Sequence, residues 1–251
     1  MINNLTEGQY FLIYNALSFT FAVMAAATLF VWLSRDHIAK RYRIATTITG
    51  LVTFIAAYHY MQIFISFHGA YTLKDGIVSQ TGYAFNDAYR YVDWLLTVPL
   101  LMIELILVMN LQPEKTVRMS WTLSLAAAAM VILGYPGEIS HDAATRWMWW
   151  TLAMIPFIYI VYTLFFGLKD SVNEQPESAR GFVRLACVLT VIVWCFYPLV
   201  FILPMLGLSD GQAEVAVQVG YSIADIFAKV GFGLLIFTIA YKKSSLENKQ
   251  L

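Results

Sequence analysis

Asp225 and Lys229 are a carboxylate and an amine inside an otherwise apolar stretch. They are four positions apart, so on a helix their side chains lie one turn apart on the same face. Lys229 comes 13 residues before the basic pair Lys242-Lys243, roughly 20 Å along a helix, which its side chain cannot span. A charge at that depth in a membrane costs about 2.5–3.5 kcal/mol. The pair therefore predicts either a structural ion pair between helices or, as we favour, a Schiff-base lysine with an aspartate counter-ion.

A second apolar stretch, residues 84–110, carries further ionisable side chains. Asp93 and Glu104 are 11 residues apart, or about three helical turns, so both carboxylates and Thr97 lie on one stripe, spread over roughly 16 Å. Arg90 lies one turn before Asp93. Together with the first pair, five unpaired ionisable groups would cost about 12–18 kcal/mol in a membrane. They must compensate one another, either as structural interhelical pairs or, as we favour, as a proton relay across the membrane.

One histidine and several tryptophans lie at a similar depth. His59 is either a packing residue or, if it touches Asp93, a group that tunes the proton affinity of that carboxylate. Trp94 and Trp194 fall well inside their apolar stretches, where an indole N–H is difficult to satisfy. We interpret these two tryptophans as walls around a flat apolar ligand.

These side chains need helices that cross a membrane to position them. The chain is 59% hydrophobic and only 13% charged, whereas a soluble domain is about 25% charged, so the sequence predicts an all-α integral membrane protein. The whole chain, residues 1–251, forms a single domain with no linker or low-complexity segment. Asp75-Gly76, between the second and third spans, predicts a short β-hairpin. Seven apolar stretches are long enough to span: 9–33, 44–67, 84–110, 117–134, 147–168, 182–206 and 213–241.

The basic residues predict the orientation of the spans. Only Lys74 and Arg146 fall on one side, and the excess on the other side marks it as cytoplasmic. The N-terminus is therefore expected outside and the C-terminus inside. The formal net charge is zero, which gives no argument for a nucleic-acid partner. The cytoplasmic set comprises Arg35, Lys40, Arg41, Arg43, Lys115, Arg118, Lys169, Arg180, Arg184, Lys242, Lys243 and Lys249.

Three motifs in three different spans resemble a known family. They are Arg90-Tyr-Val-Asp93-Trp94-Leu-Leu-Thr97-Val-Pro99-Leu followed by Glu104, then Trp194-Cys-Phe-Tyr197-Pro198, and Asp225-Ile-Phe-Ala-Lys229-Val-Gly-Phe-Gly. Over essentially the whole chain, the sequence resembles the microbial (type 1) rhodopsins of the proteorhodopsin and xanthorhodopsin-like group. The resemblance implies all-trans retinal bound to Lys229 as a protonated Schiff base, and light-driven outward proton transport. It also implies a transporter of the bacterial inner membrane, surrounded by lipid, rather than an enzyme, and no metal site.

The resemblance assigns a role to each polar residue of the third and seventh spans. Asp93 would be the counter-ion and primary proton acceptor, with Thr97 as its hydrogen-bonding partner. Glu104 would be the cytoplasmic proton donor. Asp225 would be the second counter-ion, and Arg90 would gate the exit side.

The resemblance also assigns the walls of the retinal pocket. His59 matches the family's histidine that bonds the acceptor aspartate, and Leu101 sits where the family tunes colour, with leucine as in the green-absorbing members. Members with a carotenoid antenna have a glycine where this chain has Trp150, so we expect no carotenoid antenna by that route. The residues expected to line retinal are Tyr60, Trp94, Leu101, Trp150, Trp194, Tyr197 and Pro198.

Several alternatives stay open on the sequence alone. A photosensory rhodopsin that signals through a transducer is the main alternative, although such sensors usually lack a carboxylate at the position of Glu104. A light-driven sodium pump would be expected to carry Asn, Asp and Gln at positions 93, 97 and 104, and a retinal-free transporter usually shows internal repeats. The family often forms pentamers or hexamers. The proton-release group is left among Glu138, Asp142, Asp210 and Glu214.

Overall fold

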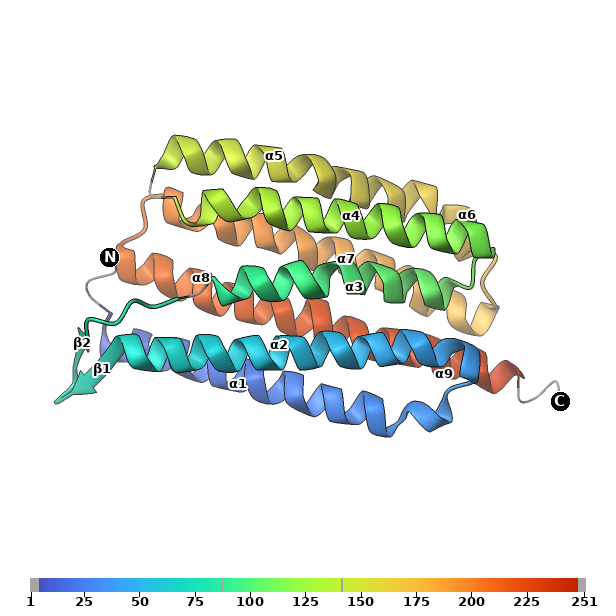
Figure 1. Cartoon of the computed structure of the whole chain (residues 1–251), viewed down its shortest axis with the longest axis horizontal. Helices are drawn as coiled ribbons and strands as arrows, with labels where there is room; N and C mark the ends of the chain where they lie inside the picture. The colour runs from blue at the N-terminus through green and yellow to red at the C-terminus, as the bar shows by residue number, and fades with distance from the viewer. Residues whose placement is uncertain (1–4, 87, 141, 248–251) are drawn as a thin grey trace.

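The computed structural model describes residues 5–86, 88–140 and 142–247. Over these residues the chain forms a bundle of long helices with a small hairpin at one end and the C-terminus at the other (Figure 1). Seven helical segments are long and apolar enough to cross a membrane, which confirms the seven expected spans. Lys249, which contributed to the basic excess, lies outside the described residues. The seven segments are Glu7–Leu33, Lys40–Ala70, Tyr89–Met109, Pro113–Glu138, Ala143–Gly167, Glu177–Met205 and Asp210–Leu246.

Several of the spans combine α-helix with a tighter or wider turn. The first four contain α1 (Glu7–Leu33), η2 (Lys40–Tyr42) with α2 (Arg43–Ala70), α3 (Tyr89–Met109) and α4 (Pro113–Glu138). The last three contain α5 (Ala143–Tyr162) with η3 (Thr163–Gly167), α7 (Glu177–Ile202) with η4 (Leu203–Met205), and α8 (Asp210–Asp225) with η5 (Ile226–Gly231) and α9 (Phe232–Glu247). Two short helices, η1 (Arg35–His37) and α6 (Lys169–Asn173), lie in the connections at the C-terminal end of the bundle.

The expected hairpin is present between α2 and α3. Strands β1 (Tyr71–Lys74) and β2 (Ile77–Gln80) pair antiparallel. The turn between them has positive φ at both central residues, 51° at Asp75 and 77° at Gly76. Positive φ at both positions is the geometry of a type I′ turn, which Asp-Gly favours because glycine has no Cβ. The sequence prediction of a hairpin is therefore confirmed.

Two residues with strong local preferences, Asn110 and Pro113, mark the end of α3, the helix that carries Asp93 and Glu104. Asn110 follows α3 in the left-handed conformation, with φ 55°, and asparagine tolerates this conformation better than most residues. Pro113 then opens α4 at its first turn, where the missing N–H of proline is not needed. These two signals fix where Glu104 lies relative to the bundle end, because Glu104 is six residues, or about 1.7 helical turns, before Asn110.

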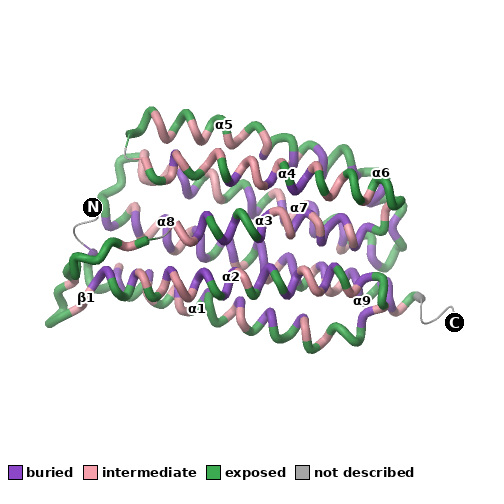
Figure 2. The backbone as a smooth tube through the Cα atoms, viewed as in Figure 1, coloured by how far each residue is buried: buried purple, intermediate pink, exposed green. Residues whose placement is uncertain are grey.

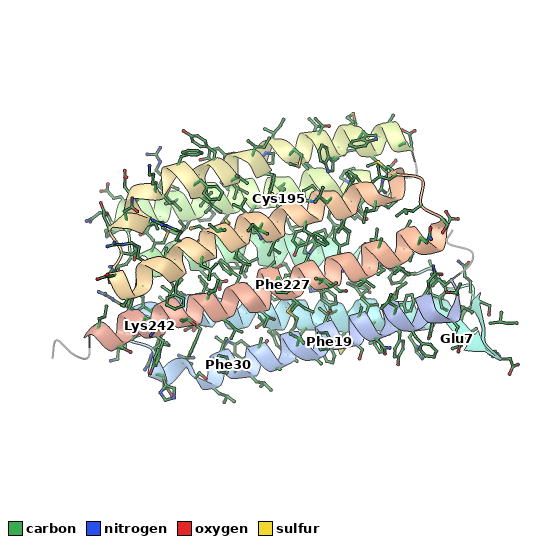
Figure 3. The ribbon with its side chains drawn as sticks, turned by 180° about the vertical axis from the view of Figure 1, so that it is seen from behind. Glu7, Phe19, Phe30, Cys195, Phe227 and Lys242 are labelled. Atoms are coloured by element: carbon green, nitrogen blue, oxygen red, sulfur yellow. The ribbon has the colours of Figure 1, made fainter. Side chains whose placement is uncertain are left out.

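The bundle is apolar on its outer face and carries buried charges within. Phe19, Phe30 and Phe227 project from the outside of the bundle (Figure 3) and are 62%, 45% and 53% exposed. Arg90 and Glu104, by contrast, are almost fully buried. Buried residues are concentrated on the sides of the helices that face into the bundle (Figure 2). An apolar exterior around a polar interior is what a protein surrounded by lipid requires, since charged side chains in spans face the bundle interior.

The last span is not a regular α-helix around its lysine. Between α8 and α9, the segment η5 is a π-helical turn that contains Lys229. Such single wide turns inside helices are frequent at functional sites. A regular helix was expected from the sequence, because no residue type marks a π-turn, but the predicted approach of Asp225 and Lys229 is retained, with 3.0 Å between Oδ2 and Nζ.

Candidate functional site

Lys229 forms ion pairs with two aspartates in the centre of the bundle. Its Nζ donates hydrogen bonds to Oδ2 of Asp93, from α3, and to Oδ2 of Asp225, which lies at 3.0 Å. Each of the three side chains is 1% exposed or less. The sequence predicted the Asp225 contact from spacing within one helix, whereas the Asp93 contact joins two helices and only the resemblance implied it. One buried cation between two buried carboxylates leaves a net negative charge that other donors must stabilise.

Three further side chains donate hydrogen bonds to Asp225. Tyr60 Oη lies 2.9 Å from Oδ2, Trp94 Nε1 lies 3.0 Å from Oδ1, and Tyr197 Oη lies 2.5 Å from Oδ1. They come from α2, α3 and α7, so Asp225 ties four helices together. Hydrogen bonds to a carboxylate stabilise its charged form. Asp225 is therefore built to remain an anion.

Asp93 has far fewer donors. Among the described residues, Lys229 is the only side chain that hydrogen-bonds to its carboxylate, and the buried Oδ1 has no partner. Thr97 Oγ1 donates to the main-chain carbonyl of Asp93 at 2.8 Å. Thr97 was expected to bond Asp93, and it does so through the backbone rather than the carboxylate. Protonation of Asp93 therefore breaks fewer hydrogen bonds than protonation of Asp225.

His59 makes no direct hydrogen bond to Asp93 among the described residues. Its Nδ1 lies 2.9 Å from the carbonyl oxygen of Ile55, one turn earlier in α2, while the ring is near enough to Asp93 to act on it electrostatically. If Nδ1 carries the proton that Ile55 accepts, Nε2 is left as an acceptor.

Glu104 lies fully buried on the same helix as Asp93. Thr49 Oγ1, from α2, donates to its Oε2 at 2.7 Å, and Oε1 has no partner in the described part of the chain. Thr49 is itself fixed by close packing, because a Cβ at Gly233 of α9 would lie only 2.5 Å from Thr49 Cγ2. Sequence reasoning missed Thr49, since one threonine in an apolar span carries no distinctive signal.

Arg90 lies on the hairpin side of the aspartates. Its Nη1 donates to Tyr60 Oη at 3.1 Å, and Nη2 donates to Gln218 Oε1. The guanidinium also lies 5.4 Å from the ring centre of Tyr221. Because Tyr60 in turn donates to Asp225, the tyrosine connects the arginine to the anion. Gln218 and Tyr221 belong to the last span, but their contact with Arg90 could not be read from the sequence.

The four carboxylates considered for proton release lie in different surroundings. Glu138 Oε2 accepts from Tyr91 Oη at 3.3 Å and Tyr221 Oη at 3.5 Å. Glu214 is 9% exposed, Asp210 is exposed, and Asp142 caps α5. The hydrogen bonds that Asp142 accepts from Thr145 lower the pKa of its carboxyl.

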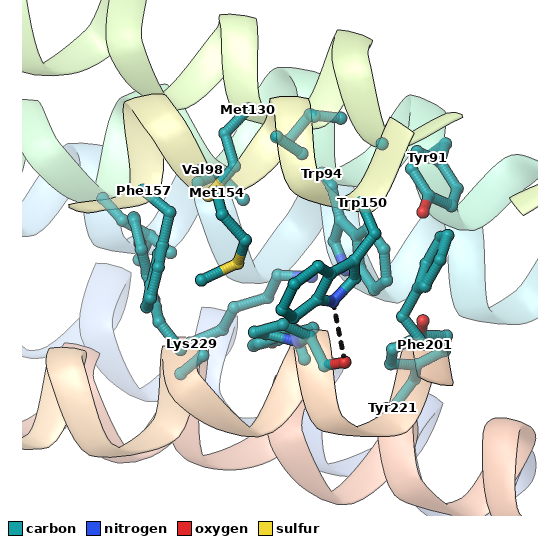
Figure 4. Close-up of a pocket in the computed structure, with 18 residues that line it drawn as sticks. Tyr91, Trp94, Val98, Met130, Trp150, Met154, Phe157, Phe201, Tyr221 and Lys229 are labelled. Atoms are coloured by element: carbon teal, nitrogen blue, oxygen red, sulfur yellow. Dashed lines mark hydrogen bonds between the residues drawn. The ribbon is translucent and has the colours of Figure 1, made fainter. Parts of the chain in front are cut away.

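An apolar pocket begins at Lys229 and runs between α3, α4, α5 and α7 (Figure 4). Six of the seven expected wall residues line it: Trp94, Leu101, Trp150, Trp194, Tyr197 and Pro198. Tyr60, the seventh residue expected in the wall, is not among the lining residues. It instead forms hydrogen bonds with Asp225 and Arg90. Sequence reasoning missed the apolar part of the wall, such as Met130 and Phe157, because these residues resemble any lipid-facing or core side chain.

Trp150 closes the pocket between α5 and α7. Its Nε1 donates to the carbonyl oxygen of Pro198 at 3.1 Å, the hydrogen bond drawn in Figure 4. The indole therefore has a fixed orientation in the wall of the pocket. The expectation that no carotenoid antenna binds at this position stays a prediction.

A buried lysine between two aspartates, at the end of an aromatic pocket inside seven membrane helices, defines a microbial rhodopsin. The chain belongs to the bacteriorhodopsin-like protein family, which matches residues 13–243. Green-light absorbing proteorhodopsin from Gamma-proteobacterium EBAC31A08 is 29% identical over 225 residues, 89% of this chain and 84% of that protein. Archaerhodopsin-1 from Halorubrum ezzemoulense is 32% identical over 213 residues, 82% of this chain and 74% of its own length.

Two solved structures superpose closely on this chain. Xanthorhodopsin, described as a light-driven ion pump with dual chromophore, has a TM-score of 0.93 and 46% identity, covering 97% of this chain and 98% of its own. Thermophilic rhodopsin has a TM-score of 0.94 and 42% identity, covering 98% and 99%. The resemblance to the proteorhodopsin and xanthorhodopsin-like group is confirmed, and the chain is a multi-pass bacterial membrane protein. At the level of the family, these relatives support a light-driven proton pump rather than a classical enzyme.

The residues present fit the retinal that this family implies. The pocket offers an amine at one end and an apolar, largely aromatic wall along its length. The unpartnered Oδ1 of Asp93 lies in the same cluster as that amine. A long apolar aldehyde needs these features: a nucleophilic amine, an apolar channel and an anion near the nitrogen.

Proposed function

We propose that this chain is a light-driven outward proton pump with all-trans retinal bound covalently at Lys229. The observation that carries the proposal is that two aspartates around one buried amine accept unequal numbers of hydrogen bonds. A third buried carboxyl, that of Glu104, lies further along α3. The two aspartates supply the negative charge that keeps a proton on Nζ in the dark. Retinal would supply light absorption and an isomerisation that turns the N–H at Nζ away from its partners.

The hydrogen bonds support Asp93 as the acceptor of the proton that leaves Nζ. Protonation of Asp225 would weaken its bonds from Tyr60, Trp94 and Tyr197, whereas Asp93 Oδ1 accepts no hydrogen bond from the described part of the chain. Each hydrogen bond to a charged group is worth about 1.5–3 kcal/mol. The proton is therefore directed to Asp93, and Asp225 stays charged as the second counter-ion.

Burial supports Glu104 as the group that returns a proton to Nζ. Glu104 is 0% exposed, and within the described ranges its carboxyl accepts one side-chain hydrogen bond, from Thr49. A carboxyl in such apolar surroundings favours its neutral form until water enters. Asp93 contacts the amine directly, whereas Glu104 lies 11 residues, or roughly 16 Å, further along α3, so the order of the two transfers would set a direction of transport.

The distribution of basic residues supports the outward direction. The end of the bundle near Glu104 carries most of the Lys and Arg residues in the connections, which supports a cytoplasmic location for that end. Arg90, on the opposite side of the aspartates, would then stand on the exit side. We also propose that no carotenoid antenna binds at the position of Trp150, which is filled and hydrogen-bonded. Assembly into pentamers or hexamers stays a prediction.

Illumination of unbuffered cells that express the chain with added retinal tests the proposal. We expect external acidification that an uncoupler abolishes. Asp93→Asn should retain bound retinal, absorb at longer wavelength because the anion is gone, and acidify nothing, while the exposed control Asp170→Asn should pump normally. An Asp93→Asn protein with unchanged colour and full proton flux would contradict the assignment. A slow photocycle without any pH change in the unaltered protein would favour a photosensor instead.

A further inference from the structure

A second cavity, separate from the apolar pocket at Lys229, lies at the end of the bundle where α3 ends and α4 begins. Its volume is about 440 Å³, and it shares no lining residue with the apolar pocket. Its walls come from η2, the end of α3, the start of α4, α6 and the segment that follows it, and α9. The cavity therefore joins elements from widely separated parts of the chain.

The charged residues that line this cavity are predominantly basic. Arg41, Lys115 and Lys243 line it, and Glu174 is the one acidic residue among its described lining residues. Three positive charges and one negative charge give a formal net charge of +2. Because each basic residue comes from a different element, the positive charges surround the cavity instead of lying along one helix.

The basic groups are held in place by contacts with the protein. Lys243, only 4% exposed, donates from Nζ to the carbonyl oxygen of Val108 at 2.5 Å and to Gln175 Oε1. Lys115 Nζ donates to Ser171 Oγ at 2.8 Å. A buried ammonium is costly unless an anion or several dipoles compensate it. Fixed cationic groups are a preorganised arrangement for an anion, since less side-chain entropy is lost on binding.

Arg41 and two helix N-termini add to the positive potential. The guanidinium of Arg41 lies 4.7 Å from the ring centre of Tyr42. Gln112 and Pro176, the N-caps of α4 and α7, both line the cavity, and neither helix has a side-chain hydrogen bond at its cap. Backbone N–H groups at helix N-termini carry partial positive charge. The helix ends reinforce the site that the three basic side chains define.

We propose that this cavity binds a phosphate group. A tetrahedral phosphate presents several acceptor oxygens in different directions, which matches basic donors that arrive from three elements. The group could belong to inorganic phosphate or to the headgroup of an anionic lipid, since both present the same chemistry. Bound there, it connects η2, α4 and α9 at the end of the bundle nearest Glu104.

Thermal unfolding of the full-length protein tests the proposal. A ligand that binds only the folded state raises Tm in proportion to the logarithm of its concentration. In nanodiscs of zwitterionic lipid, sodium phosphate should raise Tm above sodium chloride at equal ionic strength if the ligand is the free ion. If the ligand is a lipid headgroup, only the addition of phosphatidylglycerol should raise Tm.

Three variants identify the site by changing the apparent Kd of the effective ligand. Lys115→Gln should weaken binding roughly tenfold, the effect of about one charge-assisted hydrogen bond. Glu174→Gln removes the one opposing charge from an exposed position and should tighten binding severalfold, an outcome that misfolding cannot produce. Lys242→Gln, an exposed lysine next to Lys243 that does not line the cavity, should leave Kd unchanged. Equal Tm values in phosphate, phosphatidylglycerol and chloride, or equal effects of Lys115→Gln and Lys242→Gln, would overturn the proposal.

Discussion

Removal of the Lys229 ammonium should destabilise the retinal-free protein through Asp93 more than through Asp225. Lys229→Met keeps a long side chain but leaves two carboxylates buried without their shared cation. Removing one partner from a buried ion pair costs about 3–5 kcal/mol. Asp225 still has Tyr60, Trp94 and Tyr197 as donors, whereas Asp93 loses the only side-chain donor it has among the described residues.

A second substitution separates the two contributions. Asp93→Asn added to Lys229→Met should recover about 1–3 kcal/mol, the penalty for an unsatisfied buried group. Asp225→Asn added to Lys229→Met should recover less, because it also weakens bonds from three donors. The free energy of unfolding would be measured by denaturation in mixed micelles. Lys242→Met, at an exposed position of the same span, is the control, and its free energy of unfolding should lie within about 0.5 kcal/mol of that of the unaltered protein. If Asp93→Asn and Asp225→Asn recovered equal free energies of unfolding, the two aspartates would not differ in how well the protein's hydrogen-bond donors stabilise their charge.

Three other changes have distinct expected results. Glu104→Gln should slow the return of the proton to Lys229 after a flash, and added azide should restore the rate; unaltered recovery kinetics would count against Glu104 as donor. Gly233→Ala should lower the free energy of unfolding by about 1–3 kcal/mol, because the new Cβ would lie 2.5 Å from Thr49 Cγ2; an unchanged denaturation midpoint would show that the helices separate at no cost. The pKa of the Asp142 carboxyl is lowered by folding, so its contribution to stability is present above the unfolded pKa near 3.8 and is lost as pH falls through the folded pKa; Asp142→Asn should reduce this acid dependence, measured as Tm against pH.

Most of the fold could be predicted from the sequence because lipid imposes simple constraints. Apolar stretches of about 20 residues must be helices that cross the membrane, and the structure has all seven. Asp75-Gly76 identified the hairpin because few dipeptides accept positive φ at both turn positions. The π-helical turn around Lys229 had no such signal, since it depends on how the last span packs against its neighbours.

The charged part of the site could be predicted for the same reason, and the neutral part could not. A charge inside an apolar span is conspicuous, so Asp93, Glu104, Asp225 and Lys229 were identified from residue type and spacing. The hydrogen bond from Thr49 to Glu104 joins different helices, and side-chain partners across helices depend on rotation and depth that one sequence does not define. Tyr60 was assigned to the retinal wall by the resemblance, and its bonds to Asp225 and Arg90 had no signal in the sequence.

Time-resolved infrared spectroscopy of the illuminated protein tests the central claim most directly, because protonated carboxyl groups absorb separately from carboxylates. We expect a carboxyl band that appears as the proton leaves Lys229 and is absent in Asp93→Asn. We expect a second carboxyl band to be lost as the proton returns, and this loss to be absent in Glu104→Gln. If the first band persisted in Asp93→Asn and instead required Asp225, the acceptor would lie on the strongly hydrogen-bonded aspartate and the account would be wrong.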